Sequence, residues 1–578
     1  MANLSQKKRQ RMMDFLKTIR DEHKDDDAVL AAIGEIETEL NAKKYGLVWE
    51  QHEEAVDVAM RDNIPVFADV TEKEISAAPG EGYNFLLEGD NLHSLYLLEK
   101  THKGKIDVIY IDPPYNTGNR DFVYDDAFVD KEDGFRHSKW LSFMNKRLQA
   151  AKRLLRFGGL LFINIDDNEV FQIKLLCDEI FGENNFVLSL PRQTKRSGKT
   201  TGSFSKNNDY VLVYVNGSLE NFKMQPHVDK GYKLFDEYAN ERGPYKLNQT
   251  LDYDSLSYSQ SLDYPLEIDG EVFYPGSSYE KWQERQSGNH NRADWAWRWN
   301  RQLFEFGYAN GFVVIKRKKD GSARIYTKTY LNAKIEKDEN GNYQIVYTPK
   351  TKALSSLTFT ENEFSNDNAK KDLRRLGLDK LFDYSKPVAL IKALTNCHAD
   401  TCANVLDFFA GSGTTAQAVL ELNQQDGGNR HFILCTNNEN NICEEVTYPR
   451  IRTVITGKRQ DGSEYSNGIP TNFKYFKTDF VSKDAEDVSK ALLEHISEMV
   501  ELENGVKIDD KQYLIVLSDD AADELEKHWA DYPDVKEIYL SHDVLLTTRQ
   551  NQLFGQVPVK IIPDYYFKFE MKEVGEAW

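Results

Sequence analysis

Short apolar runs alternate with amphipathic segments in two separate stretches of this 578-residue chain. The runs are rich in β-branched residues and bounded by turn residues, which is typical of buried strands. The strands predicted in this way are 84–87, 108–111, 160–163, 209–214, 404–407 and 432–435. Between them, apolar positions recur with helical spacing over 92–98 and 140–155. Strands that alternate with helices form a parallel sheet, so both stretches predict α/β structure.

The other parts of the chain have different patterns. Residues 220–375 lack the alternation and are rich in Tyr, Asn and Gly, whereas residues 5–45 have apolar faces at helical spacing. The chain after about residue 470 is acidic and returns to short helices and strands. We therefore predict a helical N-terminal region (1–50), an α/β domain in two halves (51–190 and 379–470), an inserted α+β region (191–378) and a small C-terminal α/β domain (471–578).

Composition narrows the class of protein. Apolar residues make up 40% of the chain and charged residues 29%, as in soluble globular proteins, and no apolar run approaches the roughly 20 residues of a membrane span. The five cysteines form no CxxC pair, so we predict no metal site and a reducing, cytoplasmic location. The net charge of −20 excludes an overall basic nucleic-acid binder, but local basic patches can still contact phosphates.

The stretch from Val108 to Gly118 carries the first candidate chemistry. Its apolar strand ends at Asp112, because Pro113 and Pro114 cannot donate to a β-ladder. Tyr115 and a turn follow directly. A carboxylate, a rigid corner and an aromatic ring are thus predicted at the carboxyl end of a buried strand, where open α/β sheets bind ligands.

This arrangement suits a reaction at the exocyclic amine of a nucleobase. The lone pair of such an amine is delocalised into the ring, which makes the amine a weak nucleophile. The Asp112 carboxylate and the Pro113 carbonyl can accept its two protons and localise the lone pair, and Tyr115 can stack on a base taken out of its duplex. The alternative is a solvent-exposed turn after a core strand, which we consider less fitting for Asp-Pro-Pro-Tyr after Ile-Tyr-Ile.

A second candidate site follows the strand at 404–407. The segment Asp407-Phe-Phe409-Ala-Gly411-Ser-Gly413 is a glycine turn that opens a helix. Glycines let a ligand approach the backbone, and the start of a helix stabilises negative charge. Taken alone, this pattern also fits a nicotinamide dinucleotide site. After the next strand, Glu439 is a candidate for ribose hydroxyls, although it falls later than the usual spacing of about 20 residues.

With both segments placed, the chain resembles the modification subunit of type III restriction-modification systems, a β-class amino DNA methyltransferase. Asp112-Pro-Pro-Tyr-Asn-Thr-Gly118 resembles the catalytic motif of that family, in which Asp usually goes with adenine and Ser with cytosine. Phe409-Ala-Gly-Ser-Gly413 resembles its S-adenosylmethionine motif, and the order of the two motifs is that of the β-class. The resemblance covers roughly residues 40–480.

The resemblance implies a permuted doubly wound methyltransferase domain with an inserted target recognition domain. It implies catalysis by Asp112, Pro113, Pro114 and Tyr115 on adenine N6, with S-adenosylmethionine as the cofactor. The cofactor-binding residues that it implies are Asp407, Phe409, Gly411 and Gly413, with Asp90, Tyr384, Lys386 and Glu439 also near the cofactor.

Two segments are candidates for contact with double-stranded DNA. The first is a basic run without acidic residues, rich in Ser, Thr and Gly, whose cations are Arg192, Lys195, Arg196, Lys199 and Lys206. An ATP-binding phosphate loop is excluded there, because Gln193 stands where its first Gly would be. The second is the alternation of Trp295, Trp297 and Trp299 around Arg298, which is typical either of an aromatic core or of a DNA-recognition surface; we favour recognition.

Other functions remain open at this point. The same chemistry could act on cytosine N4, the chain could be a non-catalytic DNA-specificity subunit, and a nicotinamide dehydrogenase would leave Asp-Pro-Pro-Tyr without a role. The resemblance implies a separate restriction subunit with helicase and nuclease activity. We expect a homodimer, no membrane contact, and no ATP hydrolysis by this chain alone.

Overall fold

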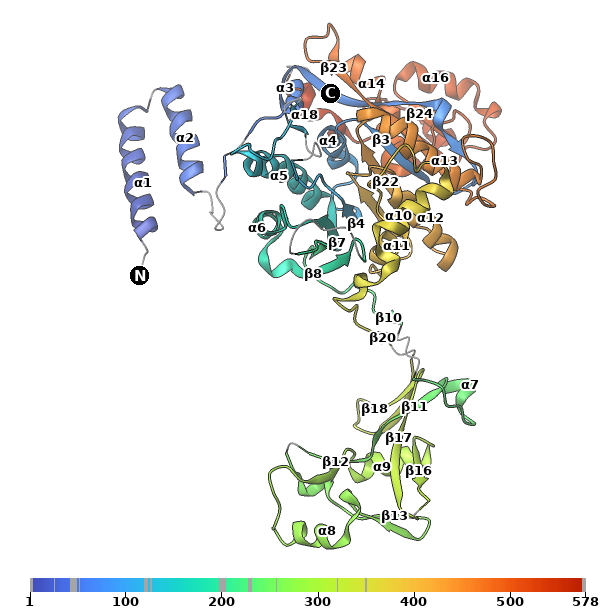
Figure 1. Cartoon of the computed structure of the whole chain (residues 1–578). Helices are drawn as coiled ribbons and strands as arrows, with labels where there is room; N and C mark the ends of the chain where they lie inside the picture. The colour runs from blue at the N-terminus through green and yellow to red at the C-terminus, as the bar shows by residue number, and fades with distance from the viewer. Residues whose placement is uncertain are drawn as a thin grey trace. The chain divides into compact units, whose positions relative to one another are not determined.

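The computed structural model describes residues 4–24, 26–41, 49–50, 52–118, 123–124, 127–196, 204–226, 231–255, 257–319, 321–348 and 351–573. The chain divides into two compact units (Figure 1). The larger unit comprises residues 1–223 and 355–578, and the inserted unit comprises residues 224–354. None of the described helices has the length and apolar composition to cross a lipid bilayer.

One mixed sheet organises the larger unit. Its strands, in spatial order, are β1 (Asn63–Asp69), β23 (Asn472–Ser482), β3 (Tyr83–Glu88), β22 (His431–Thr436), β21 (Asn404–Asp407), β4 (Ile106–Ile111), β7 (Leu155–Ile165), β9 (Asn208–Val215) and β8 (Phe186–Gln193), with the short β2 (Ile75–Ser76) paired to β23. The six strands from β23 to β7 run parallel to one another, β1 and β9 run antiparallel to them, and the edge strand β8 pairs antiparallel with β9. Because β21 pairs with both β22 and β4, the two predicted halves form one doubly wound sheet.

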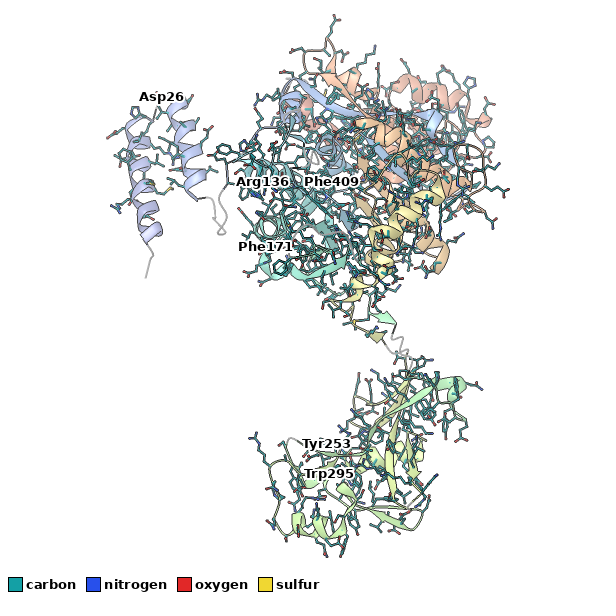
Figure 2. The ribbon with its side chains drawn as sticks, in the orientation of Figure 1. Asp26, Arg136, Phe171, Tyr253, Trp295 and Phe409 are labelled. Carbon is teal, nitrogen blue, oxygen red and sulfur yellow. The ribbon has the colours of Figure 1, made fainter. Side chains whose placement is uncertain are left out.

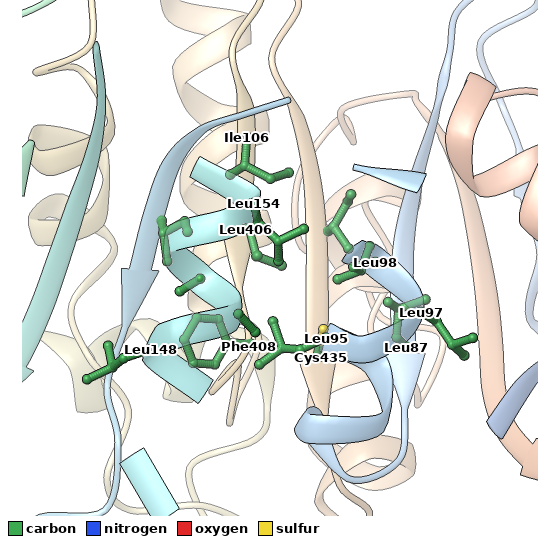
Figure 3. Packing of buried hydrophobic residues seen from close by; sticks show 14 of the residues in the cluster. Leu87, Leu95, Leu97, Leu98, Ile106, Leu148, Leu154, Leu406, Phe408 and Cys435 are labelled. Carbon is green, nitrogen blue, oxygen red and sulfur yellow. The ribbon is translucent and has the colours of Figure 1, made fainter. Parts of the chain in front are cut away.

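Helices connect these strands in two packed groups. The first group is α4 (Asn91–Thr101), α5 (Arg136–Leu154) and α6 (Val170–Phe181), and the second is α11 (Val388–Thr395), α12 (Thr414–Asp426) and α13 (Tyr448–Thr456). Figure 1 shows the two groups on either side of the strands. Apolar side chains of the first group pack on the sheet, as Figure 3 shows for Leu95 and Leu98 of α4, Leu148 of α5 and Leu406 of β21. Burial of these side chains is the main force that holds the layers together.

The chain ends also form helices. In the described N-terminal residues, α1 (Leu4–Glu22) and α2 (Asp27–Asn41) form a hairpin in which Leu16 and Ile33 are buried. After α3 (Ala55–Asp62) the main sheet begins. The C-terminal part contains α14 (Val488–Leu493), α15 (Ile496–Asn504), α16 (Asp519–Lys527), α17 (Thr548–Phe554), α18 (Lys568–Glu573) and a parallel sheet of β24 (Tyr513–Val516), β25 (Glu537–Leu540) and β26 (Val559–Ile561).

The inserted unit is built from small antiparallel sheets. Its strands are β10 (Gln225–Pro226), β11 (Tyr245–Thr250), β12 (Asp252–Asp254), β13 (Leu266–Ile268), β14 (Glu271–Phe273), β15 (Trp295–Trp297), β16 (Val313–Arg317), β17 (Ala323–Tyr330), β18 (Ala333–Lys337), β19 (Tyr343–Tyr347) and β20 (Thr351–Lys352), and its helices are α7 (Ala239–Arg242), α8 (Tyr279–Gln286) and α9 (Arg301–Ala309). An apolar core that includes Trp297, Phe304 and Ile325 holds it together. The insert therefore has the α+β character that the sequence predicts.

Three predicted domain boundaries differ from the observed ones. The inserted unit spans 224–354 and not 191–378, because the hairpin β8–β9 extends the main sheet and α10 (Asn366–Leu376) belongs to the larger unit. The expected boundary at 470/471 also falls inside the main fold. There β23 lies between β1 and β3, and α14 and α15 contribute Leu492, Ile496 and Met499 to the main core. The sheet β24–β25–β26 has a further core of its own, which includes Ile538 and Phe554.

Candidate active site at the carboxyl edge of the sheet

Four neighbouring parallel strands bring most of the predicted site residues to one edge. The strands are β3, β22, β21 and β4, and their carboxyl ends point the same way. Asp90 follows β3, Glu439 follows β22, the glycine turn follows β21 and Asp112 follows β4. Ligands of doubly wound sheets bind at this edge. Segments that are some 300 residues apart in the sequence thus meet in one place.

Among the residues that the structure describes, one oxygen of Asp112 has a partner and the other has none. Strand β4 is fully buried, and its carboxylate emerges where the prolines end the ladder. Lys386 Nζ lies 2.5 Å from Asp112 Oδ2 and 5.0 Å from the centre of the Tyr115 ring. The other oxygen, Oδ1, is buried and has no hydrogen-bond partner among the described residues. Buried acceptors are nearly always paired, so this oxygen has the capacity to accept a hydrogen bond from a ligand. Lys386, expected near the cofactor, contacts the catalytic candidate Asp112.

The Tyr115 side chain is fixed by a buried polar network. Asn164 Nδ2 donates to Tyr115 Oη at 2.6 Å and to Asp209 Oδ2 at 3.0 Å. Arg192 Nε donates to Asp209 Oδ1 at 2.7 Å, and a second guanidinium nitrogen binds Oδ2. These connected hydrogen bonds restrict the buried side chains to one arrangement. The ring of Tyr115 is therefore held at the edge of the site through its hydroxyl group.

The prediction that Arg192 contacts DNA phosphates is wrong. Its side chain is fully buried, pairs with Asp209, and donates to the carbonyl oxygen of Phe364 and to Asn366 Oδ1, both at 2.9 Å. Arg192 stands in β8 directly opposite Asp209 in β9. The run of basic residues suggested one flexible loop, whereas its first member belongs to a strand of the sheet.

The turn after Tyr115 has support that the sequence did not reveal. Trp140 Nε1 donates to the Pro114 carbonyl at 2.8 Å. Asn116 adopts a left-handed backbone (φ 55°), and its amide donates to Glu169 Oε1 at 2.6 Å. The same Glu169 oxygen lies 2.6 Å from His137 Nδ1, and burial raises the pKa of Glu169 to about 8. Trp140 lies 26 residues from Pro114, and Glu169 lies 53 residues from Asn116, so no local spacing marks them.

The glycine turn has the geometry of a cradle for a ligand. Gly411 and Gly413 have positive φ angles of 49° and 73°, and α12 begins directly after them. A Cβ atom at Gly411 would meet only the Phe409 carbonyl at 3.8 Å, so the space beside this backbone is open. At Gly413 a Cβ would lie 3.1 Å from Thr447 Cγ2, which makes the turn tight on its inner side. An open, side-chain-free backbone at a helix start fits a cofactor with a polar tail.

Asp407 lies beneath this turn and not on its surface. It is 2% exposed, and its oxygens accept hydrogen bonds from Phe409 N at 3.0 Å and from Thr415 Oγ1 at 2.5 Å. Burial raises the pKa of its carboxyl group to about 7. Asp407, predicted to bind the cofactor, therefore shapes the turn from inside.

The remaining predicted cofactor residues lie nearer to solvent. Asp90 caps α4 by accepting from Leu92 N at 2.7 Å, and its carboxylate also accepts from Arg147 at 3.2 Å. Phe409 is half-buried, and Glu439 is exposed after β22. Tyr384 is 85% exposed, so it is available to a ligand.

The other DNA candidates have mixed placements. Lys195 and Arg196 are exposed, Lys206 is exposed with its Nζ 3.7 Å from Asp167, and Lys199 lies outside the described residues. In the inserted unit, Trp297 is part of the core and donates to the Tyr264 carbonyl at 2.6 Å, so the three tryptophans do not share an exposed face. Arg298 is exposed and lies 4.3 Å from the ring of Tyr253. Figure 2 labels Tyr253 and Trp295, which belong to the paired strands β12 and β15.

Comparison with known proteins decides the family. A family model described as DNA methylase matches residues 106–447, more than half of the chain and both motifs. The chain belongs to this DNA methylase family. The resemblance inferred from the two motifs is thereby confirmed, and with it the doubly wound methyltransferase fold.

Several curated proteins are similar to this methylase. It is 31% identical over 423 residues to the Mod subunit of the type III restriction-modification enzyme StyLTI of Salmonella typhimurium LT2, covering 67% of this chain and 58% of the relative. It is 31% identical over 462 residues to the EcoPI Mod subunit of Escherichia phage P1, covering 72% and 66%. The type II methyltransferase M.KpnI of Klebsiella pneumoniae is 28% identical over 408 residues, covering 68% and 90%. The chain thus spans less than two thirds of the two type III relatives.

Proposed function

We propose that this methylase transfers a methyl group from S-adenosylmethionine to the N6 amine of adenine in double-stranded DNA. The observation that carries the proposal is the buried, unpaired Oδ1 of Asp112 at the end of β4, one strand away from the open glycine turn after β21. An amine that donates to Oδ1 would be placed between an acceptor and the cofactor cradle.

Each residue at this edge has a defined task in the proposal. Asp112 Oδ1 and the Pro113 carbonyl accept the two amine protons, which localises the nitrogen lone pair. Lys386 binds the other Asp112 oxygen and so fixes the plane of the carboxylate. The ring of Tyr115, fixed by Asn164, stacks on the base that has left the duplex. Most of the rate enhancement then comes from orientation and from a preorganised electrostatic field.

The residues around the glycine turn fit S-adenosylmethionine. Gly411 and Gly413 leave the backbone accessible, and the start of α12 can bind the polar tail, with Asp90, Phe409, Tyr384 and Glu439 around them. The bound cofactor supplies an electrophilic methyl group. The amine can lose its proton after transfer, so no side chain has to act as a base.

The choice of adenine and of the type III role rests on the motif and on the relatives. Asp, and not Ser, begins the catalytic tetrapeptide, which favours adenine N6 over cytosine N4. The relatives that share 31% identity are Mod subunits of type III enzymes. Incubation with plasmid DNA and labelled S-adenosylmethionine, followed by digestion to nucleosides, tests both points: label in N6-methyladenosine supports the proposal, and label in N4-methylcytosine contradicts it.

We also propose that the inserted unit recognises the DNA sequence. It carries 19 basic and 18 acidic residues, a net charge of +1, whereas the rest of the chain carries the whole acidic excess, a net charge of −21. Arg298, stacked on Tyr253, offers a guanidinium for base edges. Arg298→Ala should change the preferred sequence.

Replacing Lys195 and Arg196 with Ala should weaken binding to all DNA sequences. It should also lower the slope of the log of the binding constant against the log of the salt concentration by up to about 2, near 0.9 per phosphate contact.

The partners of the methylase follow from the same proposal. A separate helicase-nuclease subunit would cut unmodified DNA, and the purified chain would methylate DNA without cleaving it or hydrolysing ATP. We expect a homodimer, and the exposed Phe15 on the N-terminal hairpin is a candidate contact. Light scattering of the full chain and of Phe15→Ser tests this, because a monomeric wild-type chain would contradict the dimer.

A further inference from the structure

The guanidinium of Arg450 in α13 lies between the glycine turn and the segment that carries Lys386. Its side chain is fully buried. The Nη1 atom contacts Thr414 Oγ1 at 2.8 Å, Ser412 Oγ at 3.0 Å and Ser385 Oγ at 3.2 Å. The Nε atom donates to Gln417 Oε1 at 2.9 Å. One side chain thus joins residue 385 to the loop at 412–414, which is distant in the sequence.

Arg450 has no carboxylate at ion-pairing distance in the described part of the chain, unlike the buried Arg192 and Arg430, which pair with Asp209 and Asp426. Burial lowers the pKa of Arg450 to about 10, so the group is still charged at neutral pH. A buried charge without a counter-charge costs folding free energy. Arg450 is therefore a candidate for a role other than stabilising the fold.

The chemistry of the groups around Arg450 determines which of them donate hydrogen bonds and which accept them. A guanidinium has donors and no acceptor, so the three hydroxyl groups around Nη1 act as acceptors that share its two hydrogens. Their own hydrogens are then directed away from Arg450. The Lys386 carbonyl is an onward acceptor, at 3.2 Å from Ser385 Oγ and 3.4 Å from Thr414 Oγ1. The backbone of Lys386 is therefore held from both segments, and its Nζ holds Asp112 in turn.

We propose that Arg450 is a positioning residue for methyl transfer, which acts through Ser385 and Lys386 on the orientation of Asp112. It fixes the Asp112 carboxylate in the orientation that leaves Oδ1 unpaired. It also fixes the position of the glycine turn relative to Asp112, because the same guanidinium contacts Ser412 and Thr414. The proposal rests on the methyltransferase function proposed above. Misplacement of a reacting group by about 1 Å can cost on the order of a hundredfold in rate, which sets the scale of the expected effect.

Two variants and one control test this role. Arg450→Lys keeps the charge but cannot reach all three hydroxyls, and Ser385→Ala removes one hydroxyl without changing any charge. Arg430→Lys is the matched control, since Arg430 is equally buried but binds Asp426 at the far end of α12. Acylation of Lys386 by an amine-reactive ester, followed by mass spectrometry, reports its position without any need for activity.

We expect the labelling of Lys386 to rise at least fivefold in Arg450→Lys and in Ser385→Ala, and to remain unchanged in Arg430→Lys. In Ser385→Ala the kcat for methyl transfer should fall at least tenfold while the KM for the cofactor stays within threefold. Unchanged Lys386 labelling in Ser385→Ala would overturn the proposal, even if Arg450→Lys failed to fold. Altered labelling in a chain whose wild type transfers no methyl group would overturn the proposed function and leave the positioning of Lys386 intact.

Discussion

Asp112 and Asp407 end two neighbouring parallel strands, yet their carboxylates have opposite environments. Asp112 follows β4, is partly exposed, and has one oxygen on Lys386 and the other unpaired. Asp407 is the last residue of β21, is buried, and has both oxygens bonded, one to Phe409 N in the turn and the other to Thr415 Oγ1 at the start of α12. Asp112 was predicted as a site residue from its place at the end of an apolar strand, and Asp407 from the resemblance to the family's cofactor motif. A position at the carboxyl edge of the sheet is therefore not enough to make a carboxylate available to a ligand.

The residues that follow each aspartate account for the difference. Two residues after Asp407, the backbone N–H of Phe409 donates to its carboxylate. The equivalent position after Asp112 is Pro114, which has no N–H. The Pro-Pro corner thus prevents the turn from satisfying its own aspartate and leaves an acceptor for the substrate. The two prolines contribute to the proposed chemistry because they have no backbone N–H to donate.

Removing the ligand-facing carboxylate should have the largest effect. We expect Asp112→Ala to lower methyl transfer at least about a thousandfold, the upper end of what losing one preorganised polar contact costs. Calorimetry should show an affinity for S-adenosylmethionine within threefold of wild type, because Asp112 does not belong to the glycine turn. Turnover within tenfold of wild type would remove Asp112 from the mechanism.

Filling the cradle above Asp407 should have the next largest effect. Gly411→Val places a side chain in the open space beside the turn, so the cofactor Kd should rise about a hundredfold or more. Gly427→Val is the control, because Gly427 also has a positive φ angle and open surroundings but lies at the other end of α12. Equal losses of cofactor affinity in both variants would show that backbone strain, and not occupancy of the site, is responsible.

Making the two turns alike should reduce the difference between the aspartates. In Pro114→Ala the new backbone N–H can donate to the Asp112 carboxylate, as Phe409 N does to Asp407. We expect roughly a fivefold lower kcat, since the typical net worth of a hydrogen bond is about 1 kcal/mol and the amine must now compete for its acceptor. Thermal melting of both proteins controls for stability. An unchanged kcat would mean that the missing N–H has no part in activity.

The sequence predicts the parts of the site that are continuous in the chain. The strand, the Pro-Pro corner and the glycine turn are local patterns, and the structure places them on adjacent strands. Arg192 and Asp209 could not be paired in advance, because their contact depends on the register of the β8–β9 hairpin, and only β9 was predicted as a strand. Asn164, Trp140 and Glu169 reach the catalytic turn through the packing of β7, α5 and α6. Such contacts depend on tertiary structure, which no spacing in the sequence encodes.

Neutralising the buried aspartate should have the smallest effect on catalysis and a pH-dependent effect on stability. The folded-state pKa of Asp407, about 7, is above the usual value of 3.8, so the folded protein binds this proton more tightly than the unfolded chain. The contribution of this carboxyl group to the free energy of unfolding is fully present below about pH 4. It falls by about 1.4 kcal/mol per pH unit as the pH rises to about 7. Asp407→Asn removes this dependence. Relative to wild type, its free energy of unfolding in urea should therefore improve by about 3 kcal/mol between pH 5 and pH 8, with methyl transfer within threefold. A stability difference that does not vary with pH would mean that Asp407 is ionised in the fold, and that the two aspartates differ only in their partners.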